Sequence, residues 1–465
     1  MSIYNSSLGI LKVSEVLKKA RTGGGKVHLI GVLGAGQRGI AELLLKEGVK
    51  VSGSDRQGKE NAAGLIEAGL EFYPTHDGKN IDGAVLVAYT LAISEDNPEY
   101  RLAKERKIPT VSRAELAAAL ASERGKIITV AGTHGKSTVT AMLDSVFSLS
   151  GKSPTTLSGA ELSSGGFSHK GDGEFFIAEA CEYKDSFLRF RPSAAIINNI
   201  ELDHTDYFKG ERALLRSFSR YLGRASDFAL IPSDDSLCAS LNIVEGVRTV
   251  SFGADIGAEY RYTLVALGGE KNIFSVLSKK HGELGEFELN IPGIFNISNA
   301  TAAIATAFEY GLDLERIREG IASYRGIKRR MEYIGKYRAR DVFYDYAHHP
   351  TEIYSVICAL RTMGHETITV VFKSHTFSRT ASFFSDFARS LSLADFALIG
   401  DIFAAREENL WGITPQNLVN AIGENAYYTA DENVTEILDN FTRGTIIVMG
   451  AADMTEVLSK MNLKA

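Results

Sequence analysis

Short apolar runs alternate along the chain with segments whose apolar residues recur at helical spacing, a pattern that predicts alternating strands and helices. The first run covers residues 27–32, a helical pattern extends through residue 45, and a second run covers residues 49–54. Further short runs at residues 83–89 and 110–111 precede a polar stretch at residues 122–125. Continuous apolar runs are typical of parallel strands that are buried on both faces.

The same alternation starts again twice. A second series has its apolar runs at residues 127–131, 175–180, 194–199 and 228–232. The pattern changes near residues 324–330, and a third series has its runs at residues 342–346, 368–372, 396–399 and 446–449. We therefore predict an α/β protein of three domains, each a mostly parallel sheet with flanking helices, at residues 1–123, 124–326 and 327–465.

Composition supports several domains and excludes some partners. The chain has 465 residues, 45% of them hydrophobic, and a net charge of −6 without a basic block, so neither nucleic acid nor a membrane surface is an expected partner. The three cysteines lack metal-ligand spacing, which favours a reducing compartment. Residues 1–26 contain no long apolar core, so we expect no leader or membrane insertion and place the protein in the cytoplasm. A monomer and a homodimer both remain open.

The stretch at residues 127–138 predicts a phosphate-binding loop between a strand and a helix. Gly132 and Gly135 can turn backbone N–H groups toward an anion, Lys136 can neutralise phosphate charge, and Ser137 can ligate Mg²⁺. The expected helix carries one apolar face and a glycine stop, made by Val139, Met142, Leu143, Val146, Phe147 and Gly151. The central domain is thus predicted to be a P-loop ATP-binding domain.

A second glycine turn follows the first predicted strand. Gly34, Gly36 and Gly39 have the spacing of a dinucleotide fold, and Asp55 lies about 20 positions further on. On its own this turn indicates NAD or another diphosphate, since it offers only N–H groups and a helix N-terminus. The N-terminal domain is predicted to be Rossmann-like, and so is the C-terminal domain.

Polar residues follow two further strands of the central series. Glu179 ends one predicted strand and His204 lies just beyond the next. We expect these strands to be neighbours, so that both side chains could join Ser137 in holding Mg²⁺.

These segments resemble the ordered motif series of the Mur ligases, a family of ATP-dependent amide-forming ligases. The resemblance extends over roughly residues 27–455 and is far more specific than any single motif. It rests on residues 131–138, 178–180, 186–188, 199–206, 293–300, 329–330 and 345–352. The member that adds L-alanine is resembled by residues 30–42, 53–55, 96–99 and 372–380.

The resemblance implies a reaction and its partners. L-Alanine would be ligated to UDP-N-acetylmuramate in peptidoglycan precursor synthesis, with ATP and Mg²⁺ as cofactors. ATP would phosphorylate the sugar carboxylate, and the alanine amine would attack the acyl phosphate.

The resemblance also implies roles for individual residues. The UDP-sugar would contact Gly34, Ala35, Gly36, Gly39, Asp55 and His76. ATP would contact Gly132, Thr133, His134, Gly135, Lys136, Ser137, Thr138, Asn296, Asn299, Arg330 and Asp345. Mg²⁺ would be held by Ser137, Glu179 and His204, and the catalytic group would comprise Lys136, His204, His348, His375 and Arg379.

Four positions depart from the family pattern. Leu33 replaces a usual glycine, Cys181 an aspartate, Phe295 a histidine and Thr376 an arginine. The phosphate-binding residues are all present, so these departures bear on sugar and amino-acid specificity.

Three alternative functions remain open on the sequence. The first is a Mur-type ligase with a different amino acid or peptide acceptor. The second is a non-catalytic nucleotide-binding regulator or scaffold, against which the set of Lys136, Ser137, Glu179 and His204 argues. The third is an NAD-dependent oxidoreductase, which would leave the phosphate-binding loop without a role.

Overall fold

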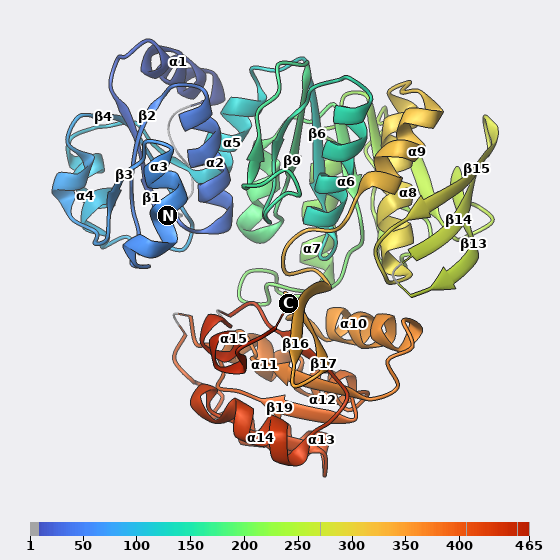
Figure 1. Ribbon diagram of the computed structural model, residues 1–465. Helices are drawn as coiled ribbons and strands as arrows, with labels where there is room; N and C mark the ends of the chain where they lie inside the picture. Colours follow the sequence, from blue (N-terminus) through green and yellow to red (C-terminus); the bar gives the residue numbers. More distant parts are fainter. Residues whose placement is uncertain (1–8, 270, 406, 453, 465) are drawn as a thin grey trace. The chain divides into compact units, whose positions relative to one another are not determined.

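The computed structural model describes residues 9–269, 271–405, 407–452 and 454–464. Residues 1–8, which belong to the predicted domain 1–123 and to the segment expected to lack a leader, lie outside the described residues. The chain forms three α/β domains, each with its own sheet (Figure 1). The positions of the two domain boundaries stay a prediction.

By their internal packing the described residues divide into two compact units. The first comprises the described residues up to Ile200 together with Leu215–Ser251 and Ala302–Gly320. The second comprises Glu201–Leu214, Phe252–Thr301 and the described residues from Ile321 onward. Each unit is described below by itself.

The first sheet has five parallel strands in the order β3-β2-β1-β4-β5, with α2 and α4 on opposite sides in Figure 1. The strands predicted at residues 27–32, 49–54, 83–89 and 110–111 are confirmed. The strands are β1 (Lys26–Ile30), β2 (Lys50–Ser54), β3 (Glu71–Tyr73), β4 (Ala84–Tyr89) and β5 (Thr110–Ser112). The helices are α1 (Ile10–Arg21), α2 (Ala35–Lys46), α3 (Ala63–Glu67), α4 (Pro98–Glu105) and α5 (Arg113–Ala121).

The central sheet has ten strands in the order β15-β14-β13-β12-β11-β10-β6-β9-β7-β8. The strands are β6 (Lys126–Ala131), β7 (Thr155–Leu157), β8 (Ser168–His169), β9 (Phe175–Glu179), β10 (Ala194–Ile197), β11 (Phe228–Pro232), β12 (Thr249–Gly253), β13 (Tyr260–Gly268), β14 (Lys271–Ser278) and β15 (Gly282–Leu289). The helices are α6 (Lys136–Leu149), α7 (Glu211–Leu222), α8 (Phe295–Glu309) and α9 (Leu314–Ser323). The four predicted strands of this domain are β6, β9, β10 and β11.

One expectation about this sheet is wrong. The strand ending at Glu179 and the strand that precedes His204 are not neighbours, because β6 lies between β9 and β10 and pairs with both in parallel. The apolar pattern identifies each strand but does not record the direction of the crossover that follows it. Glu179 therefore ends the strand directly beside the one that leads into the phosphate-binding loop.

Three antiparallel strands, β13, β14 and β15, were not foreseen from the sequence. Their buried positions alternate with more exposed ones, as in the run of β14 from Asn272 to Ser278. Strands with one solvated face lack the continuous apolar run by which the parallel strands were recognised.

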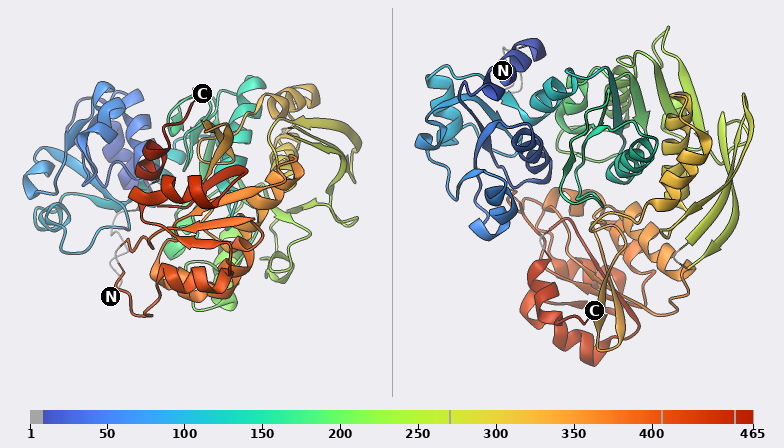
Figure 2. Two further views of the ribbon diagram at one scale, coloured as in Figure 1. Left: turned by 60° about the horizontal axis from the view of Figure 1, so that its bottom comes forward. Right: turned by 45° about the horizontal axis from the view of Figure 1, so that its top comes forward.

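The C-terminal sheet has six strands in the order β16-β17-β21-β18-β19-β20, seen from two directions in Figure 2. The strands are β16 (Glu332–Tyr337), β17 (Arg340–Asp345), β18 (Ile368–Phe372), β19 (Phe396–Ile399), β20 (Ala426–Tyr428) and β21 (Thr445–Met449). The helices are α10 (Pro350–Thr362), α11 (Phe377–Ser382), α12 (Phe384–Leu391), α13 (Pro415–Ile422), α14 (Val434–Phe441) and α15 (Thr455–Met461).

Alternate side chains of β18 and β21 enter two different cores. Val370 and Ile447 pack with residues of α10, α12 and α13, whereas Val371 and Val448 pack with residues of α14 and α15. Because successive side chains of a strand point to opposite faces, a continuous apolar run can fill both cores. This explains why residues 368–372 and 446–449 were predictable as buried strands.

No helix among the described residues is both long and apolar enough to cross a membrane.

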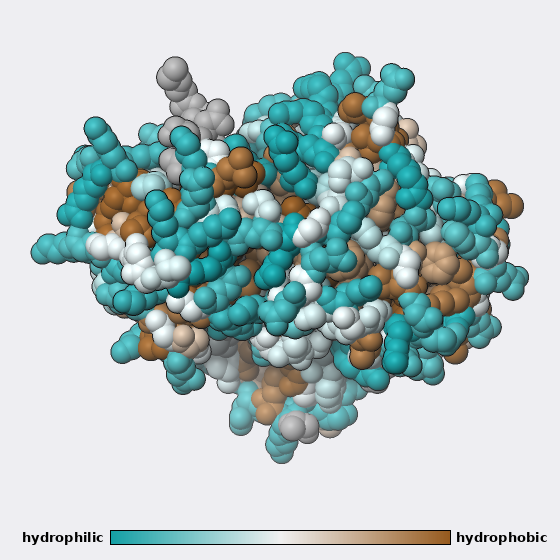
Figure 3. Space-filling view, turned by 90° about the horizontal axis from the view of Figure 1, so that it is seen from above, coloured by the Kyte–Doolittle hydropathy of each residue, from teal (hydrophilic) through white to brown (hydrophobic). Residues whose placement is uncertain are grey.

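Figure 3 shows one face of the molecule, on which hydrophilic side chains predominate and hydrophobic ones form smaller patches.

Candidate functional site

The phosphate-binding loop predicted at residues 131–138 connects β6 to α6. Gly132 and Gly135 both have positive φ angles, 132° and 77°, a backbone conformation that residues with a side chain rarely adopt. A Cβ atom at Gly132 would lie only 3.0 Å from the carbonyl oxygen of Asn199. Gly135 is the N-cap of α6, whose first turn contains no acidic residue. The loop thus directs a helix N-terminus at a site suited to an anion.

Two asparagines at the end of β10 hold this loop in place. Asn199 accepts a hydrogen bond from the backbone N–H of His134 at 2.8 Å, and its carbonyl accepts one from Thr133 at 3.1 Å. The side-chain amides of Asn198 and Asn199 both donate to the carbonyl oxygen of His134, at 2.9 and 3.0 Å. The turn is short, and these contacts from a neighbouring strand fix its conformation.

Lys136 lies against its own loop. Its ammonium group donates to the carbonyl oxygens of Gly132 and, at 3.0 Å, of Thr133, and it lies 3.4 Å from a carboxylate oxygen of Glu182. Burial opposes the charge, but Glu182 and the other acidic groups outweigh it and raise the pKa of Lys136. Lys136 therefore carries a positive charge at the loop. Sequence reasoning missed Glu182, whose only signal was its position three residues after Glu179.

Glu179 ends β9 and is paired in register with Val130 of β6. Its carboxylate accepts a hydrogen bond from the backbone N–H of Gly159 and lies 3.4 Å from the hydroxyl of Ser158. A Cβ at Gly159 would approach the same carboxylate to 2.7 Å, so the glycine makes room for it. The Glu179 carboxylate and the Ser137 hydroxyl are oxygen donors of the kind that Mg²⁺ prefers, and the residues present therefore fit this ion.

His204 belongs to the second unit and has a left-handed backbone, with a φ angle of 51°. Its N–H donates to the carboxylate of Asp203 at 2.7 Å. Its grouping with Ser137 and Glu179 stays a prediction.

The first glycine turn departs in detail from the dinucleotide pattern. The left-handed glycine is Gly31, with a φ angle of 77°, whereas Gly34 has an ordinary φ of −61° and caps α2. A Cβ at Gly34 would come no closer than 3.5 Å to any atom outside its immediate neighbours. The N–H of Leu33 donates to the carboxylate of Asp55 at 3.0 Å. Asp55 thus ties the end of β2 to the turn.

Gly36 and Gly39 are packed closely against other groups, and a side chain at either position would collide with its neighbour. A Cβ at Gly36 would lie 2.6 Å from a guanidinium nitrogen of Arg113, and one at Gly39 would lie 2.8 Å from the carbonyl oxygen of Phe167. Arg113, which begins α5, thus places a positive charge beside the first turn of α2. Sequence reasoning missed Arg113, since no motif links it to a turn almost 80 residues earlier.

His76 lies beside a buried hydrogen-bonded network centred on Glu99. The Nδ1 atom of His76 is 3.0 Å from Glu99 Oε2 and 2.9 Å from Ser54 Oγ, and Ser54 donates to the same Oε2 at 2.6 Å. The other oxygen, Oε1, accepts from Asn80 at 2.7 Å and lies 3.4 Å from His28 Nε2. Burial raises the pKa of Glu99, but the two nearby histidines and the hydrogen bond from Ser54 outweigh it and lower the pKa to about 2.

Asn296 and Asn299, expected at adenine, lie in the first turns of α8. Both are buried, and the amide of Asn299 donates to the side-chain oxygen of Asn296 at 3.0 Å. The Asn296 amide in turn donates to the carbonyl oxygen of Pro292 at 2.6 Å. The structure therefore brings these two predicted residues together in one hydrogen-bonded chain.

Asp345, expected at the ATP ribose, is buried at the end of β17. Its carboxylate accepts hydrogen bonds from the backbone N–H groups of Met331 and Ala347, each at 2.7 Å. Burial raises the pKa of Asp345 to about 6, although Arg330 opposes the shift. Asp345 therefore holds the backbone next to Arg330 against the end of β17. Arg330 itself lies 3.5 Å from Glu352.

Arg379 makes a bidentate ion pair with Asp203. Nη2 of the guanidinium lies 3.0 and 3.1 Å from the two carboxylate oxygens, and Nε is 3.2 Å from Oδ1. The remaining nitrogen, Nη1, donates to the carbonyl of His375 at 2.8 Å. Burial opposes ionisation of Asp203, but the neighbouring positive groups hold its pKa well below the usual range. Asp203 is a further residue that the motif comparison did not single out.

Two of the predicted histidines of the second unit, His348 and His375, are held neutral. Burial lowers the pKa of His348 to about 3, and burial together with Arg379 lowers that of His375 to about 4. His348 Nδ1 is 3.0 Å from the carbonyl of Tyr346, and the ring of His375 stacks on Phe403. Neutral imidazoles can accept or relay a proton.

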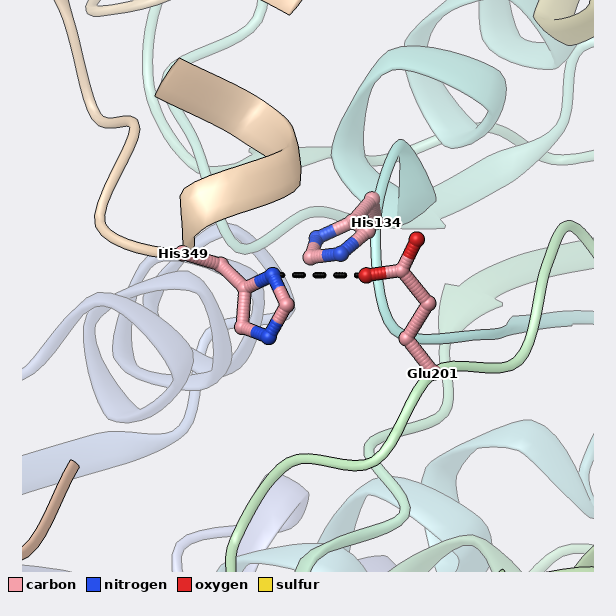
Figure 4. Close-up of side chains that lie close together, drawn as sticks. All are labelled: His134, Glu201 and His349. Atoms are coloured by element: carbon pink, nitrogen blue, oxygen red, sulfur yellow. Dashed lines mark ion pairs between the residues drawn. The ribbon is translucent and has the colours of Figure 1, made fainter. Parts of the chain in front are cut away.

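A third histidine, His349, was not assigned a role from the sequence. Figure 4 shows its ring facing Glu201, with 3.3 Å between Nδ1 and the carboxylate. Glu201 also accepts a hydrogen bond from the hydroxyl of Thr351 at 2.7 Å. These contacts join the segment carrying Asp203 to the start of α10.

The four departures from the family pattern have clear positions. Leu33 is buried, Cys181 is a partly exposed free thiol, and Phe295 is exposed at the start of α8. Thr376 is the N-cap of α11, with its hydroxyl 3.0 Å from that of Ser378.

Three family models match successive parts of the chain. Residues 26–124 match the model described as Mur ligase family, catalytic domain. Residues 130–307 match the Mur ligase middle domain. Residues 329–454 match the model described as Mur ligase, glutamate ligase domain. The order of the three models is that of the three sheets.

Curated relatives are similar over nearly the whole chain. The UDP-N-acetylmuramate--L-alanine ligase of Agathobacter rectalis is 37% identical over 442 residues, which is 93% of this chain and 96% of the relative. The enzyme of that name from Alkaliphilus metalliredigens is 36% identical over 436 residues, 92% of this chain and 95% of the relative.

Solved structures agree with this similarity. A UDP-N-acetylmuramate-alanine ligase from Thermotoga maritima has a TM-score of 0.80 at 26% identity, covering 94% of this chain and 98% of its own. A murein peptide ligase from Psychrobacter arcticus has a TM-score of 0.72 at 22% identity, covering 95% and 100%, and so shows the common fold. By its three matched models and its similarity to these relatives, the chain belongs to the Mur ligase family.

Proposed function

We propose that the chain is an ATP-dependent ligase that joins L-alanine to UDP-N-acetylmuramate during peptidoglycan precursor synthesis. One observation carries the proposal: the chain has two separate glycine turns, each leading from a strand into a helix N-terminus, where Gly34 caps α2 and Gly135 caps α6. A ligase that uses both a sugar nucleotide and ATP needs two such turns. An oxidoreductase that binds only NAD would use one.

The proposed reaction has two steps. A carboxylate oxygen of the sugar lactyl group attacks the γ-phosphorus of ATP, forming a C–O–P bond while ADP departs. The amine of L-alanine then attacks the acyl carbon, forming the amide bond, while phosphate departs and the nitrogen loses a proton. Because a free carboxylate is a poor electrophile, the protein's task is to position the reactants and neutralise phosphate charge.

We assign the ATP phosphates to the loop of residues 132–138. Lys136 supports this assignment, since its ammonium is charged and lies on the loop carbonyls that flank the anion site. Ser137, Glu179 and His204 are the proposed Mg²⁺ ligands, and when bound this ion would neutralise phosphate charge. Adenine is assigned to Asn296 and Asn299, the phosphates also to Arg330, and the ribose to Asp345.

We assign the UDP-sugar to Gly34, Ala35, Gly36, Gly39, Asp55 and His76. Arg113 supports a diphosphate at this turn, because its guanidinium lies on Gly36 and adds positive charge next to the helix N-terminus. The connection between Asp55 and Leu33 supports the same assignment, since it brings both ends of the predicted site together.

We assign the incoming amino acid to the group around Arg379. His348 and His375 are neutral and can relay the proton that the amine releases. Asp203 holds Arg379 in a fixed orientation, so that the guanidinium supplies a fixed positive charge toward which the amino-acid carboxylate can be drawn. All three cysteines are free thiols, which supports a reducing, cytoplasmic location.

The test is release of inorganic phosphate in the presence of ATP, Mg²⁺ and UDP-N-acetylmuramate, with L-alanine, L-serine and glycine offered separately. We expect release that requires both the sugar nucleotide and L-alanine. Release with another amino acid or a peptide would show that the chain uses a different acceptor. Thr376 would then be the first residue to test for a role in acceptor specificity. If no amino acid that is offered gives phosphate release, the proposal is overturned, and retained binding of ATP would then favour a non-catalytic nucleotide-binding role.

A further inference from the structure

The network beneath His76 leaves only one arrangement of protons at its Nδ1 atom. Two groups lie within hydrogen-bond distance of this atom, Glu99 Oε2 at 3.0 Å and Ser54 Oγ at 2.9 Å. Both carboxylate oxygens accept hydrogen bonds from groups other than histidine, Oε2 from Ser54 and Oε1 from Asn80, and the pKa of Glu99 is lowered to about 2, so the carboxylate carries no proton at neutral pH. Ser54 has a single hydroxyl proton, which it donates to Glu99. Neither neighbour can donate to Nδ1, so the proton must be on His76 itself.

The rest of the network fixes the carboxylate of Glu99. Its side chain is fully buried, and its Oε1 atom accepts from Asn80 and lies against His28. His28 is likewise fully buried and lies 2.9 Å from the hydroxyl of Ser52. The backbone N–H of Glu99 donates to Asn97, the N-cap of α4, so the residue cannot rotate without breaking several contacts.

The network is attached to the proposed UDP-sugar site at both ends. Ser54 is the last residue of β2 and directly precedes Asp55, whose carboxylate holds Leu33. Of the two histidine rings beside Glu99, His76 has 13% of its side chain exposed, whereas His28 is fully buried. An imidazole whose Nδ1 is engaged in the network has Nε2 as its other hydrogen-bonding atom.

From this arrangement we infer that Glu99 is a positioning residue that holds His76 in its Nδ1–H tautomer, so that Nε2 is offered to the UDP-sugar as a hydrogen-bond acceptor. The inference rests on the proposed function, because it concerns the same sugar-nucleotide site. It defines the chemistry of the ligand group that His76 recognises: a donor, such as a hydroxyl or a ring N–H of the nucleoside, and not a phosphate oxygen. The phosphates are then left to the glycine turn and Arg113.

The direct test is the tautomer of His76 in the ligand-free protein. Selective ¹⁵N-histidine labelling and long-range ¹H–¹⁵N spectra distinguish Nδ1–H from Nε2–H, and the His76→Gln variant identifies the signal. We expect Nδ1–H in the wild type. In Glu99→Gln, the new amide can donate to Nδ1, so we expect a shift toward Nε2–H. An Nε2–H tautomer in the wild type would overturn the inference.

Binding of UDP-N-acetylmuramate and of uridine supplies the second readout. Glu99→Gln should weaken both ligands about ten-fold, the effect of one hydrogen bond. Glu105→Gln, an exposed position on the same helix, is the matched control and should bind like the wild type. In a His76→Ala background, Glu99→Gln should have almost no further effect, because a positioning residue acts only through the group it positions.

Additive losses in the double variant would reduce Glu99 to a general structural role and overturn the inference. The proposed function is tested separately by the wild type alone. A wild type that binds neither UDP-N-acetylmuramate nor uridine contradicts the proposed function, whereas a wild type that binds both, with Glu99→Gln unchanged, contradicts only the role of Glu99.

Discussion

Arg379 and Asp203 form a bidentate ion pair, with Nη2 of the guanidinium 3.0 and 3.1 Å from the two carboxylate oxygens. The two residues are 176 positions apart in the chain, and both side chains are largely buried. A guanidinium held in this way keeps its positive charge in one position and orientation beside His375.

Asp203→Asn should therefore raise the KM for L-alanine by about ten-fold, because it removes one charge-assisted contact that orients Arg379. The KM values for ATP and the UDP-sugar should change much less. Steady-state kinetics with each substrate varied in turn gives the measurement. Glu408→Gln, an exposed carboxylate of the same unit, serves as the control. Equal increases for all three substrates would show that Asp203 has a wider role than orienting Arg379.

Lys136→Ala should lower kcat by roughly 10²- to 10³-fold, the loss associated with removing one preorganised charge from a transition state. Binding of the UDP-sugar, measured by calorimetry, should remain as in the wild type, because the sugar turn belongs to a different sheet. Lys152→Ala, an exposed lysine beyond the same helix, should have no effect on either quantity. Loss of UDP-sugar binding in Lys136→Ala would contradict the assignment of the two turns.

Glu179→Gln should increase the Mg²⁺ concentration needed for half-maximal activity by about ten-fold, because the amide keeps the shape of the side chain but loses its charge. A Mg²⁺ titration at saturating substrates gives the measurement. Asp172→Asn, which changes an exposed carboxylate in the same domain, is the matched control. An unchanged requirement would remove Glu179 from the proposed ligands.

Gly36→Ala and Gly34→Ala should differ although both change a glycine of the same turn. At Gly36 the added methyl would meet the guanidinium of Arg113 at 2.6 Å, and the arginine must move. At Gly34 the nearest atom is 3.5 Å away and the φ angle is ordinary. We expect Gly36→Ala to weaken UDP-sugar binding about ten-fold and Gly34→Ala to change it little. Equal binding of the UDP-sugar by both variants would show that Arg113 takes no part in binding it.

The stability of the protein should depend on the neutral state of His348. Burial lowers its pKa from about 6.5 in the unfolded chain to about 3, so the unfolded state binds more protons between these values. The contribution of His348 to the free energy of unfolding is therefore complete above pH 6.5 and is lost as the pH falls toward 3. Between pH 3 and pH 6.5, His348→Gln should reduce the slope of the free energy of unfolding against pH by up to about 1.4 kcal/mol per pH unit.

Chemical unfolding of the wild type and of His348→Gln at several pH values between 4 and 7 gives this difference. His281→Gln, in the turn between β14 and β15, controls for the loss of a histidine elsewhere in the chain. Asp345, whose pKa is raised to about 6, acts in the opposite direction, and its contribution cancels when the two proteins are compared. Parallel curves for the wild type and His348→Gln would contradict the neutral, buried state.

Local features of the site were predictable because one short segment contains everything that they need. The strand, turn and helix around Gly132 and Gly135 follow from an apolar run, two glycines and a helical face, and the structure has them in these places. Sequence reasoning also placed Glu179 at the end of its strand. It was wrong about the order of strands, because periodicity records whether a segment is buried and not which side of β6 it occupies.

The residues that sequence reasoning missed are partners of the predicted ones. Glu182 lies beside Lys136, Arg113 on Gly36, Asp203 beside Arg379, and Glu99 beneath His76. Glu182 and Arg113 carry no signal of their own, since a charged residue in a loop or a first helical turn is common in any sequence. Glu99 and Asp203 lie in segments that resemble the family motifs, residues 96–99 and 199–206, but nothing in the sequence assigned either of them a role. Their importance comes from the side chain that each one contacts.

The alternation of strands and helices, the two glycine turns and the family can be recognised in the sequence, since these depend on residues that lie close together in the chain. The strand order, the tautomer offered by His76, the orientation of Arg379 and the protonation of His348 follow only from the folded structure. Each of these depends on contacts between residues far apart in the sequence and on burial, which changes the energy of a charge or an unpaired proton. The chain specifies the chemical groups of the proposed site, and the packing around them sets the state in which each group is presented.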